Sequence, residues 1–406
     1  MSEIRVTSIV GENGSDPVGL STGFTVGPTS GTTATITHEG QASFTGIVTA
    51  TSFVPTEGQL SHRNKVHNGD MRISQRYGTT AHTPSSTTRN YVIDRWAYWS
   101  NQASKTSIQQ VTDAPAGFKH SAKCTSLSAH TADAGHWFGY TTTIEAQDIY
   151  DLAQGTANAK SFTLSFYVKS SITGTWAAAV RTKPGSPSRS YPFNYTINSQ
   201  NTWERKTITI PGSTDGTWLT DNNEGICIWF DLGTGSTFHA TANQWYSGNA
   251  VGPSASPFIA VNGATWLVTG VQLEVGSVAT PFEHRSYADE LRRCQRYFFN
   301  ITGNNGSRSG IPGYANSTSS LRCMVQFPAP MRAIPTVSGS STAMVFDSHD
   351  DSASFNCSSL TAGGAPTTSN PTQMCIEVGT SGMTNGQGGQ LEFRAANGFI
   401  NFSAEL

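Results

Sequence analysis

The sequence contains little charge and no long apolar run. Lys, Arg, Asp and Glu make up 13% of the 406 residues, and 25 basic residues against 27 acidic ones give a net charge of −2. The charges are scattered, so we expect no nucleic-acid partner, which would require a basic patch. The sequence contains no run of about eighteen consecutive apolar residues. Residues 1–5 do not have the basic start, followed by an apolar stretch, that is typical of a secretory signal. We therefore expect neither membrane insertion nor a secretory signal.

Patterns typical of metal or catalytic chemistry are also missing. The six cysteines form no CxxC pair and the ten histidines no HExxH, so we expect no metal, no cofactor, and free, buried thiols. The GxSxG match at residues 19–23 lies in a Gly-rich extended stretch, which lacks the strand-to-helix turn of a nucleophile elbow. We find no β-solenoid repeat. We expect a protein that is not an enzyme, although unpatterned acids such as Glu204, Asp215 and Asp231 leave a polysaccharide depolymerase open.

The residues that are abundant favour strands and turns. Gly (40) and Pro (18) disfavour long helices, whereas 20 Phe, 12 Tyr and 9 Trp provide the apolar surface that a disordered chain lacks. Apolar and polar residues alternate in 162–168, 226–232 and 266–275, which predicts strands with one buried face. The sequence therefore predicts an all-β fold with a central jelly-roll sandwich.

We expect four parts along the chain. They are an N-terminal extended β segment (1–59), the sandwich (60–285), a short helical connector (286–299) and a C-terminal β-sandwich tip (300–406). The N-terminal segment cannot bury a core alone, so it should pack on other copies or on a larger body. In the connector, Tyr287, Leu291, Cys294 and Phe298 are spaced four, three and four apart. This seam either docks on the sandwich or lines a trimer axis, and the sequence leaves both open.

Several short motifs, in a fixed order, carry a resemblance to a known family. They are residues 68–76 and 94–96 near the start of the sandwich, 271–276, 279–283 and 294–298 at its end, and the flanking runs 46–53, 327–337 and 402–406. In these motifs the chain resembles tail fibre, or receptor-binding, proteins of tailed bacteriophages. It is most similar to cyanophage fibres with a carbohydrate-binding-like jelly-roll domain. The loops between the motifs carry no such resemblance.

The resemblance implies a homotrimeric structural protein of the virion tail, assembled in the host cytoplasm. The N-terminal segment would attach it to other tail or baseplate proteins, and the remainder would recognise a host surface glycan or an outer-membrane receptor. Three copies on one fibre would raise the affinity through avidity. Two alternatives stay open: an architectural tail or baseplate connector without recognition, and a depolymerase tailspike.

Tryptophans are the candidate glycan-binding residues, because an aromatic face packs on the apolar side of a sugar ring. Trp96, Trp229 and Trp266 have apolar or strand-patterned neighbours and are expected in the core. Trp218 and Trp245 lie among polar loop residues and are the preferred ligand contacts. The other candidates are Trp99, Trp137, Trp176 and Trp203.

A rival recognition region lies in the C-terminal part, in loops 304–314 and 347–351. Tyr314 is its candidate aromatic contact. Asp347, Asp350 and Asp351 are candidate ligand-binding residues that could also hold calcium, but their spacing does not match a known calcium loop. A solvated turn is the favoured interpretation of the acidic cluster.

Overall fold

The structure is a computed structural model that describes most of the chain. The described residues are 24–26, 34–36, 42–44, 61–85, 87–183, 185, 187–253, 258–303, 307–348, 353–363, 370–394 and 398–406. The chain forms two compact units, Met1–Thr56 and Glu57–Leu406. In the first unit a three-stranded antiparallel sheet consists of β1 (Phe24–Val26), β2 (Ala34–Ile36) and β3 (Ala42–Phe44). The run at 46–53 lies outside the described residues.

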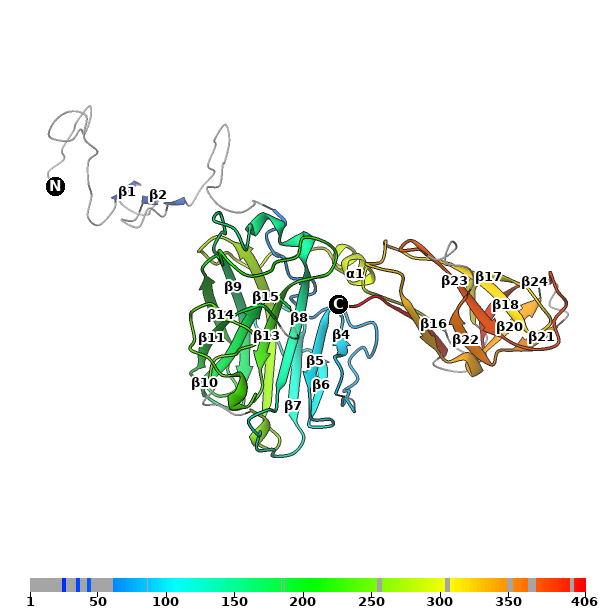
Figure 1. Ribbon diagram of the computed structural model, residues 1–406, viewed down its shortest axis with the longest axis horizontal. Coiled ribbons are helices and arrows are strands. Elements are labelled where there is room, and N and C mark those ends of the chain that lie inside the picture. Colours follow the sequence, from blue (N-terminus) through cyan, green and yellow to red (C-terminus); the bar gives the residue numbers. More distant parts are fainter. Residues whose placement is uncertain are drawn as a thin grey trace, which may run out of the picture. The chain divides into compact units, whose positions relative to one another are not determined.

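The second unit begins with a sandwich of two antiparallel sheets (Figure 1). The seven-stranded sheet, in the order β14–β11–β10–β13–β8–β5–β4, contains β4 (Asn90–Ile93), β5 (Trp96–Ser100), β8 (Phe138–Glu145), β10 (Gly174–Arg181), β11 (Arg189–Ile197), β13 (Glu224–Asp231) and β14 (Tyr246–Ser247). The five-stranded sheet, in the order β12–β9–β15–β7–β6, contains β6 (Thr106–Val111), β7 (Ser121–Ser126), β9 (Phe162–Ser170), β12 (Glu204–Ile210) and β15 (Thr265–Val275). The chain crosses repeatedly between the sheets, so the predicted all-β class and its jelly-roll sandwich are confirmed.

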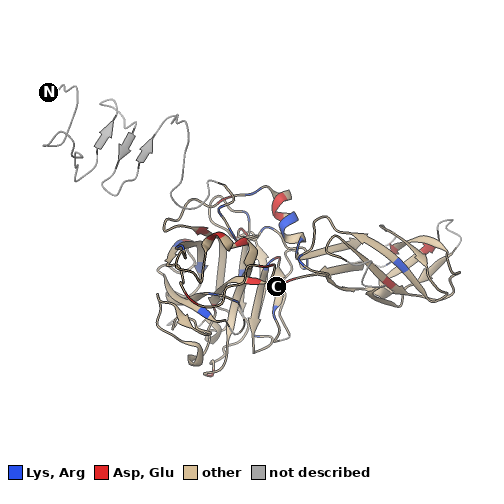
Figure 2. Cartoon of the chain, turned by 45° about the horizontal axis from the view of Figure 1, so that its top comes forward, with Lys and Arg blue, Asp and Glu red and all other residues tan. Residues whose placement is uncertain are grey.

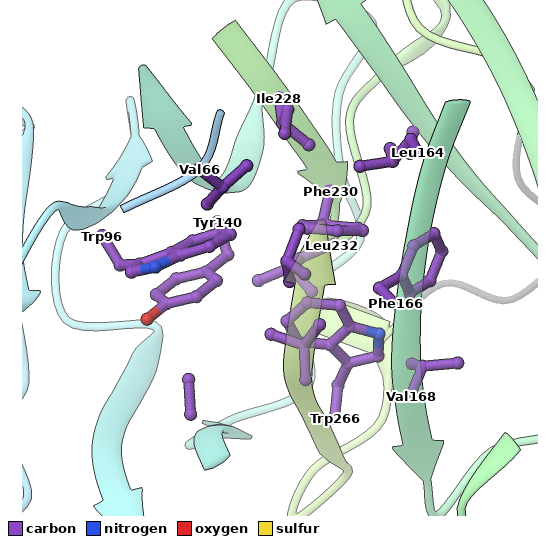
Figure 3. Packing of buried hydrophobic residues seen from close by; sticks show 14 of the residues in the cluster. Val66, Trp96, Tyr140, Leu164, Phe166, Val168, Ile228, Phe230, Leu232 and Trp266 are labelled. Carbon is purple, nitrogen blue, oxygen red and sulfur yellow. The ribbon is translucent and has the colours of Figure 1, made fainter. Parts of the chain in front are cut away.

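Large apolar residues fill the space between the two sheets (Figure 3). Trp96 stacks on Tyr140 with ring centroids 5.4 Å apart, and Trp266 lies 5.3 Å from Phe230. The predicted inward positions of β9 are all completely buried, namely Phe162, Leu164, Phe166 and Val168. The period-two pattern of the sequence thus identifies the inner face of the strand.

Helix α1 (Tyr287–Gln295) follows the sandwich. Cys294 is completely buried, and buried Glu290 accepts a hydrogen bond from the backbone N–H of Asn68. The helix therefore docks on its own sandwich, one of the two arrangements that the seam left open. It ends before Phe298, where β16 begins, so the predicted seam is shorter than expected. In the part of the chain that the structure describes, no helix is long and apolar enough to cross a membrane.

The C-terminal part consists of two further antiparallel sheets. One has the order β16–β25–β19 and contains β16 (Phe298–Gly303), β19 (Thr336–Gly339) and β25 (Gly398–Ser403). The other has the order β21–β20–β24–β17–β18–β23–β22 and contains β17 (Ser307–Ala315), β18 (Ser320–Gln326), β20 (Met344–Ser348), β21 (Ser354–Asn356), β22 (Ser359–Ala362), β23 (Gln373–Gly379) and β24 (Gly388–Phe393). Their apolar faces share a second core, as the expected C-terminal β region requires.

Charged residues and short helical turns complete the described chain. Figure 2 shows basic and acidic residues interspersed, and α1 carries both signs.

The six cysteines are free and buried, as expected. Short 3-10 helices occur at Ala146–Asp148, Tyr150–Leu152, Ser236–Phe238, Phe258–Ala260 and Ser341–Ala343.

The motifs at residues 68–76, 94–96 and 402–406 meet in a buried polar network. Asn68 of the first motif donates its side-chain amide to the backbone oxygens of Ile73 and Asp94, both at 2.8 Å. Arg95 of the second motif is 2% exposed and forms an ion pair with Glu405 of the C-terminal motif. These contacts connect the start of the sandwich with residues 402–406.

Candidate functional site

The outer face of the seven-stranded sheet carries a second aromatic cluster, separate from the sandwich core. Trp229 points away from the core, since its neighbours on β13, Ile228 and Phe230, belong to the inner face. It pairs across the sheet with Ala179 of β10. Trp99 of β5 lies on the same outer face, with its ring centroid 6.0 Å from that of Trp229. The sheet thus presents two indoles side by side on its outer surface.

This cluster lines a pocket of about 300 Å³, here called the aromatic pocket. Trp137 forms a further wall, edge-on to Trp99 at 6.4 Å and to Phe238 at 5.9 Å. Trp99 and Trp137 are half-buried, and Trp99 is held by a hydrogen bond from its Nε1 to the Thr87 oxygen at 3.2 Å. The lining residues are Trp99, Trp137, Arg181, Gly185, Trp229, Thr234, Phe238 and Asn249.

Gly139 of β8 makes room for the Trp229 indole. A Cβ atom at Gly139 would lie 2.1 Å from Cε2 and 2.2 Å from Cζ2 of Trp229, which is far inside van der Waals contact. Only a residue without a side chain lets the indole lie this close to the sheet. The glycine therefore sets the depth of the aromatic pocket.

Replacing Gly139 with alanine (G139A) should displace the Trp229 indole. Overpacking of this kind costs roughly 1–3 kcal/mol, so we expect a lower urea midpoint and changed tryptophan fluorescence. Gly135→Ala is the matched control, because a Cβ atom there meets nothing within 4 Å. An unchanged midpoint and spectrum for G139A would contradict the described packing.

Several polar atoms around the aromatic pocket have no hydrogen-bond partner among the residues that the structure describes. The ring nitrogens of Trp137 and Trp229, Nε of Arg181 and Oδ1 of Asn249 are buried, and none has a hydrogen-bond partner. Buried polar groups are nearly always hydrogen-bonded, so four such atoms at one pocket are unusual. They offer three donors and one acceptor to a ligand that is itself rich in donors and acceptors.

Among the described residues that line the aromatic pocket, Arg181 alone is charged. It is 2% exposed, and its guanidinium carbon lies 4.3 Å from the centroid of the Trp229 ring, a cation–π contact. Burial lowers the pKa of Arg181 to about 10, so the side chain stays positively charged at neutral pH. The pocket therefore combines aromatic walls with one buried cation.

The two preferred tryptophans of the sequence analysis lie elsewhere. Trp218 and Trp245 contact each other edge-on at 5.8 Å, and both pack against the sandwich core. Their ring nitrogens are already bonded, Trp218 to the Asp215 oxygen at 3.1 Å and Trp245 to the Pro211 oxygen at 2.8 Å. Neither lines the aromatic pocket. Their contacts are those of residues that fasten loops to the sandwich.

The remaining tryptophan predictions have mixed outcomes. Trp99 and Trp137 are wall residues of the aromatic pocket, whereas the expectation for Trp176 was wrong because it is completely buried in the sandwich core. Trp203 is half-buried and donates its Nε1 to Asp113 at 3.1 Å. Trp229 is buried as expected, but it lies outside the sandwich core and lines the pocket.

Two candidate residues of the C-terminal part, Tyr314 and Asp347, have described positions. Tyr314 is 49% exposed on β17. Asp347 is buried on β20 and paired with Arg394 at 3.2 Å, so the expected solvated turn was wrong at this residue. Asp350 and Asp351 lie outside the described residues. Among the residues with described positions, no group of three or more His, Cys, Asp or Glu side chains could hold a metal ion.

Comparison with known proteins gives structural similarities at low sequence identity. No family model matches the chain, and neither does any curated protein. The chain is similar to the enzymatically active domain of tailspike protein 4 of bacteriophage CBA120, at 13% identity and a TM-score of 0.28; the match covers 52% of this chain but spans only 21% of that one.

Two similar solved structures are those of a sugar-binding protein and of a carbohydrate-binding module. One is a sugar-binding protein of Bacteroides thetaiotaomicron, at 12% identity and a TM-score of 0.30, covering 53% of this chain and all (100%) of that one. The other is a family 11 carbohydrate-binding module of a Clostridium thermocellum cellulase, at 14% identity and a TM-score of 0.25, covering 50% and 100%. These TM-scores lie below 0.5, so the functional proposal rests on the geometry of the pocket.

Proposed function

We propose that the chain binds a glycan in the aromatic pocket of its sandwich and does not cleave it. The observation that carries the proposal is the coincidence of aromatic walls with unpartnered polar atoms. Sugar rings have apolar faces that pack on indoles and hydroxyl groups that both donate and accept hydrogen bonds. The half-buried rings of Trp99 and Trp137 can pack on the apolar face of a sugar ring. The buried polar atoms of Arg181 and Asn249 can form hydrogen bonds with its hydroxyl groups.

We infer further that this glycan belongs to a host surface and that the chain is a homotrimeric tail fibre protein of a phage virion. The support is the ordered set of motifs that resemble such fibres. The N-terminal segment would then attach the fibre to other tail or baseplate proteins. Trimerisation would serve binding, because three weak sites on one fibre raise the effective local concentration of each for the host surface.

Adsorption of the purified, fluorescently labelled protein to susceptible and resistant host cells tests this function, with the mass in solution measured alongside. We expect selective binding by a trimer, and no reducing sugar released from the host envelope. Release of reducing sugar would favour a depolymerase. A protein that binds no susceptible cell would favour an architectural connector.

A further inference from the structure

Two arginines of the described chain, Arg95 and Arg181, are each only 2% exposed. Burying a cation is costly unless an acid and hydrogen bonds compensate it. Arg95 has that compensation, because it forms an ion pair with Glu405. Among the residues that the structure describes, Arg181 forms no ion pair, and its Nε has no hydrogen-bond partner. The sandwich thus maintains a buried positive charge at the pocket wall.

The acidic residues near the aromatic pocket form no ion pair with Arg181 among the residues that the structure describes. Asp231 acts on it electrostatically but does not line the pocket, and its Oδ1 accepts a hydrogen bond from the backbone N–H of Thr234 at 2.9 Å. Arg89 lies 5.3 Å from the Trp99 ring and is paired with Glu224 at 2.8 Å. Of these two arginines, Arg181 alone keeps its charge free for a ligand.

We propose that the aromatic pocket selects an acidic sugar, a uronic acid whose carboxylate pairs with the guanidinium of Arg181. This inference rests on the proposed glycan-binding function and names the ligand class of the same site. The sugar ring would pack on the indoles of Trp99 and Trp137, which places its carboxylate toward the buried cation.

A carboxylate fits this arginine for two reasons. The guanidinium group is a rigid planar donor whose N–H groups match a carboxylate in paired hydrogen bonds. One side of the guanidinium is covered by the Trp229 ring, and the contact excludes water, so the ion pair would form in a medium of low polarity. A pocket of about 300 Å³ is at the lower end of small-ligand sites, which suits one or two sugar residues.

The full-length protein should be titrated, by calorimetry, with oligomers of galacturonic, glucuronic and mannuronic acid. Each oligomer has a matched control in which the carboxyl groups are reduced to alcohols, so that size and linkage are kept while the charge is lost. We expect a uronic-acid oligomer to bind and its reduced form to bind about 30-fold more weakly or worse. This comparison uses the unaltered protein and does not depend on the folding of a variant.

Two variants test whether the preference for the acidic oligomer depends on Arg181. Arg181→Gln should lower the affinity for the acidic oligomer to that of the reduced form, and Arg181→Lys should give an intermediate affinity because it keeps the charge but loses the planar donor set. Arg181→Gln removes a buried charge that forms no ion pair with any described residue, so its urea midpoint should be equal or higher. Loss of acid binding with an intact midpoint supports a direct contact.

The outcomes separate the inference from the function on which it rests. Equal affinity for acidic and reduced oligomers, unaffected by Arg181→Gln, overturns the acidic-sugar inference and leaves glycan binding standing. If the protein binds sulfated galactan oligomers but no uronic-acid oligomer, the inference that the ligand is a carboxylate is overturned. Failure of a panel of neutral, carboxylated and sulfated glycans to bind at all overturns both proposals.

Discussion

Replacing Trp99 with alanine (W99A) is expected to lower the affinity for the glycan by about tenfold to a hundredfold. A half-buried aromatic ring at the centre of a binding pocket typically contributes about 1.4–2.8 kcal/mol, and each 1.4 kcal/mol is a factor of ten. Trp99 is better suited to this test than Trp229, because the deeply packed Trp229 also supports the sheet. The measurement is calorimetric titration with polysaccharide extracted from susceptible cells.

The matched control for W99A is Trp203→Ala. Trp203 is also half-buried and also donates its ring nitrogen to one oxygen, that of Asp113 at 3.1 Å, but it does not line the aromatic pocket. Removing it should leave the affinity unchanged. If W99A binds as tightly as the unaltered protein while a pair of substitutions at Trp218 and Trp245 abolishes binding, the site is at those two loops and the aromatic pocket is not the glycan site.

The fold could be predicted from local pattern because the sandwich buries one face of each strand. The alternation in β9 and β13 identified the inner residues directly, for example Phe166 and Phe230. Strand order, by contrast, depends on pairings between segments far apart in the chain, such as β5 with β8 and β8 with β13. No single strand carries that information, which is why the sheet orders emerged only from the structure.

The sequence analysis named Trp99 and Trp137 of the aromatic pocket as candidates but missed its other functional residues. The omission has a physical explanation. Trp229 was assigned to the core because its neighbours are apolar. Successive side chains of a strand point to opposite faces, so Trp229, which lies between the inward-facing Ile228 and Phe230, faces outward. The same alternation along β10 would have placed Arg181 on the outer face. Asn249 lies in a loop after β14, and no periodicity reports its position. Local polarity made Trp218 and Trp245 conspicuous, although that polarity reflects hydrogen bonds that hold their own loops.

The motifs and the candidate site separate cleanly in the structure. The motif residues Asn68, Arg95 and Glu405 join distant parts of the chain through buried hydrogen bonds and ion pairs. Among the pocket residues, Trp99 and Arg181 lie between the motifs in sequence. This separation fits a scaffold that is held by a fixed polar network and carries its recognition residues on positions that can vary without disturbing that network.

Replacing Glu405 with glutamine (E405Q) is expected to lower the free energy of unfolding by about 3–5 kcal/mol, the usual cost of removing one partner from a buried ion pair. The Glu405 side chain is 6% exposed and pairs with both Arg76 and Arg95, whose side chains are 12% and 2% exposed. The substitution keeps the volume but leaves two largely buried guanidinium groups without their anion. Urea unfolding followed by tryptophan fluorescence measures the change.

Glu377→Gln is the comparison that gives the E405Q result its meaning. Glu377 also faces an arginine, Arg322, but at 3.9 Å and with both side chains at least one-third exposed (39% and 33%), so its loss should cost no more than about 1 kcal/mol. A similarly small effect for E405Q would mean that the C-terminal residues do not fasten the sandwich. A large effect restricted to E405Q would show that Glu405 is the anion that balances the buried charges of Arg76 and Arg95, and that this contact joins residues 402–406 to the start of the sandwich.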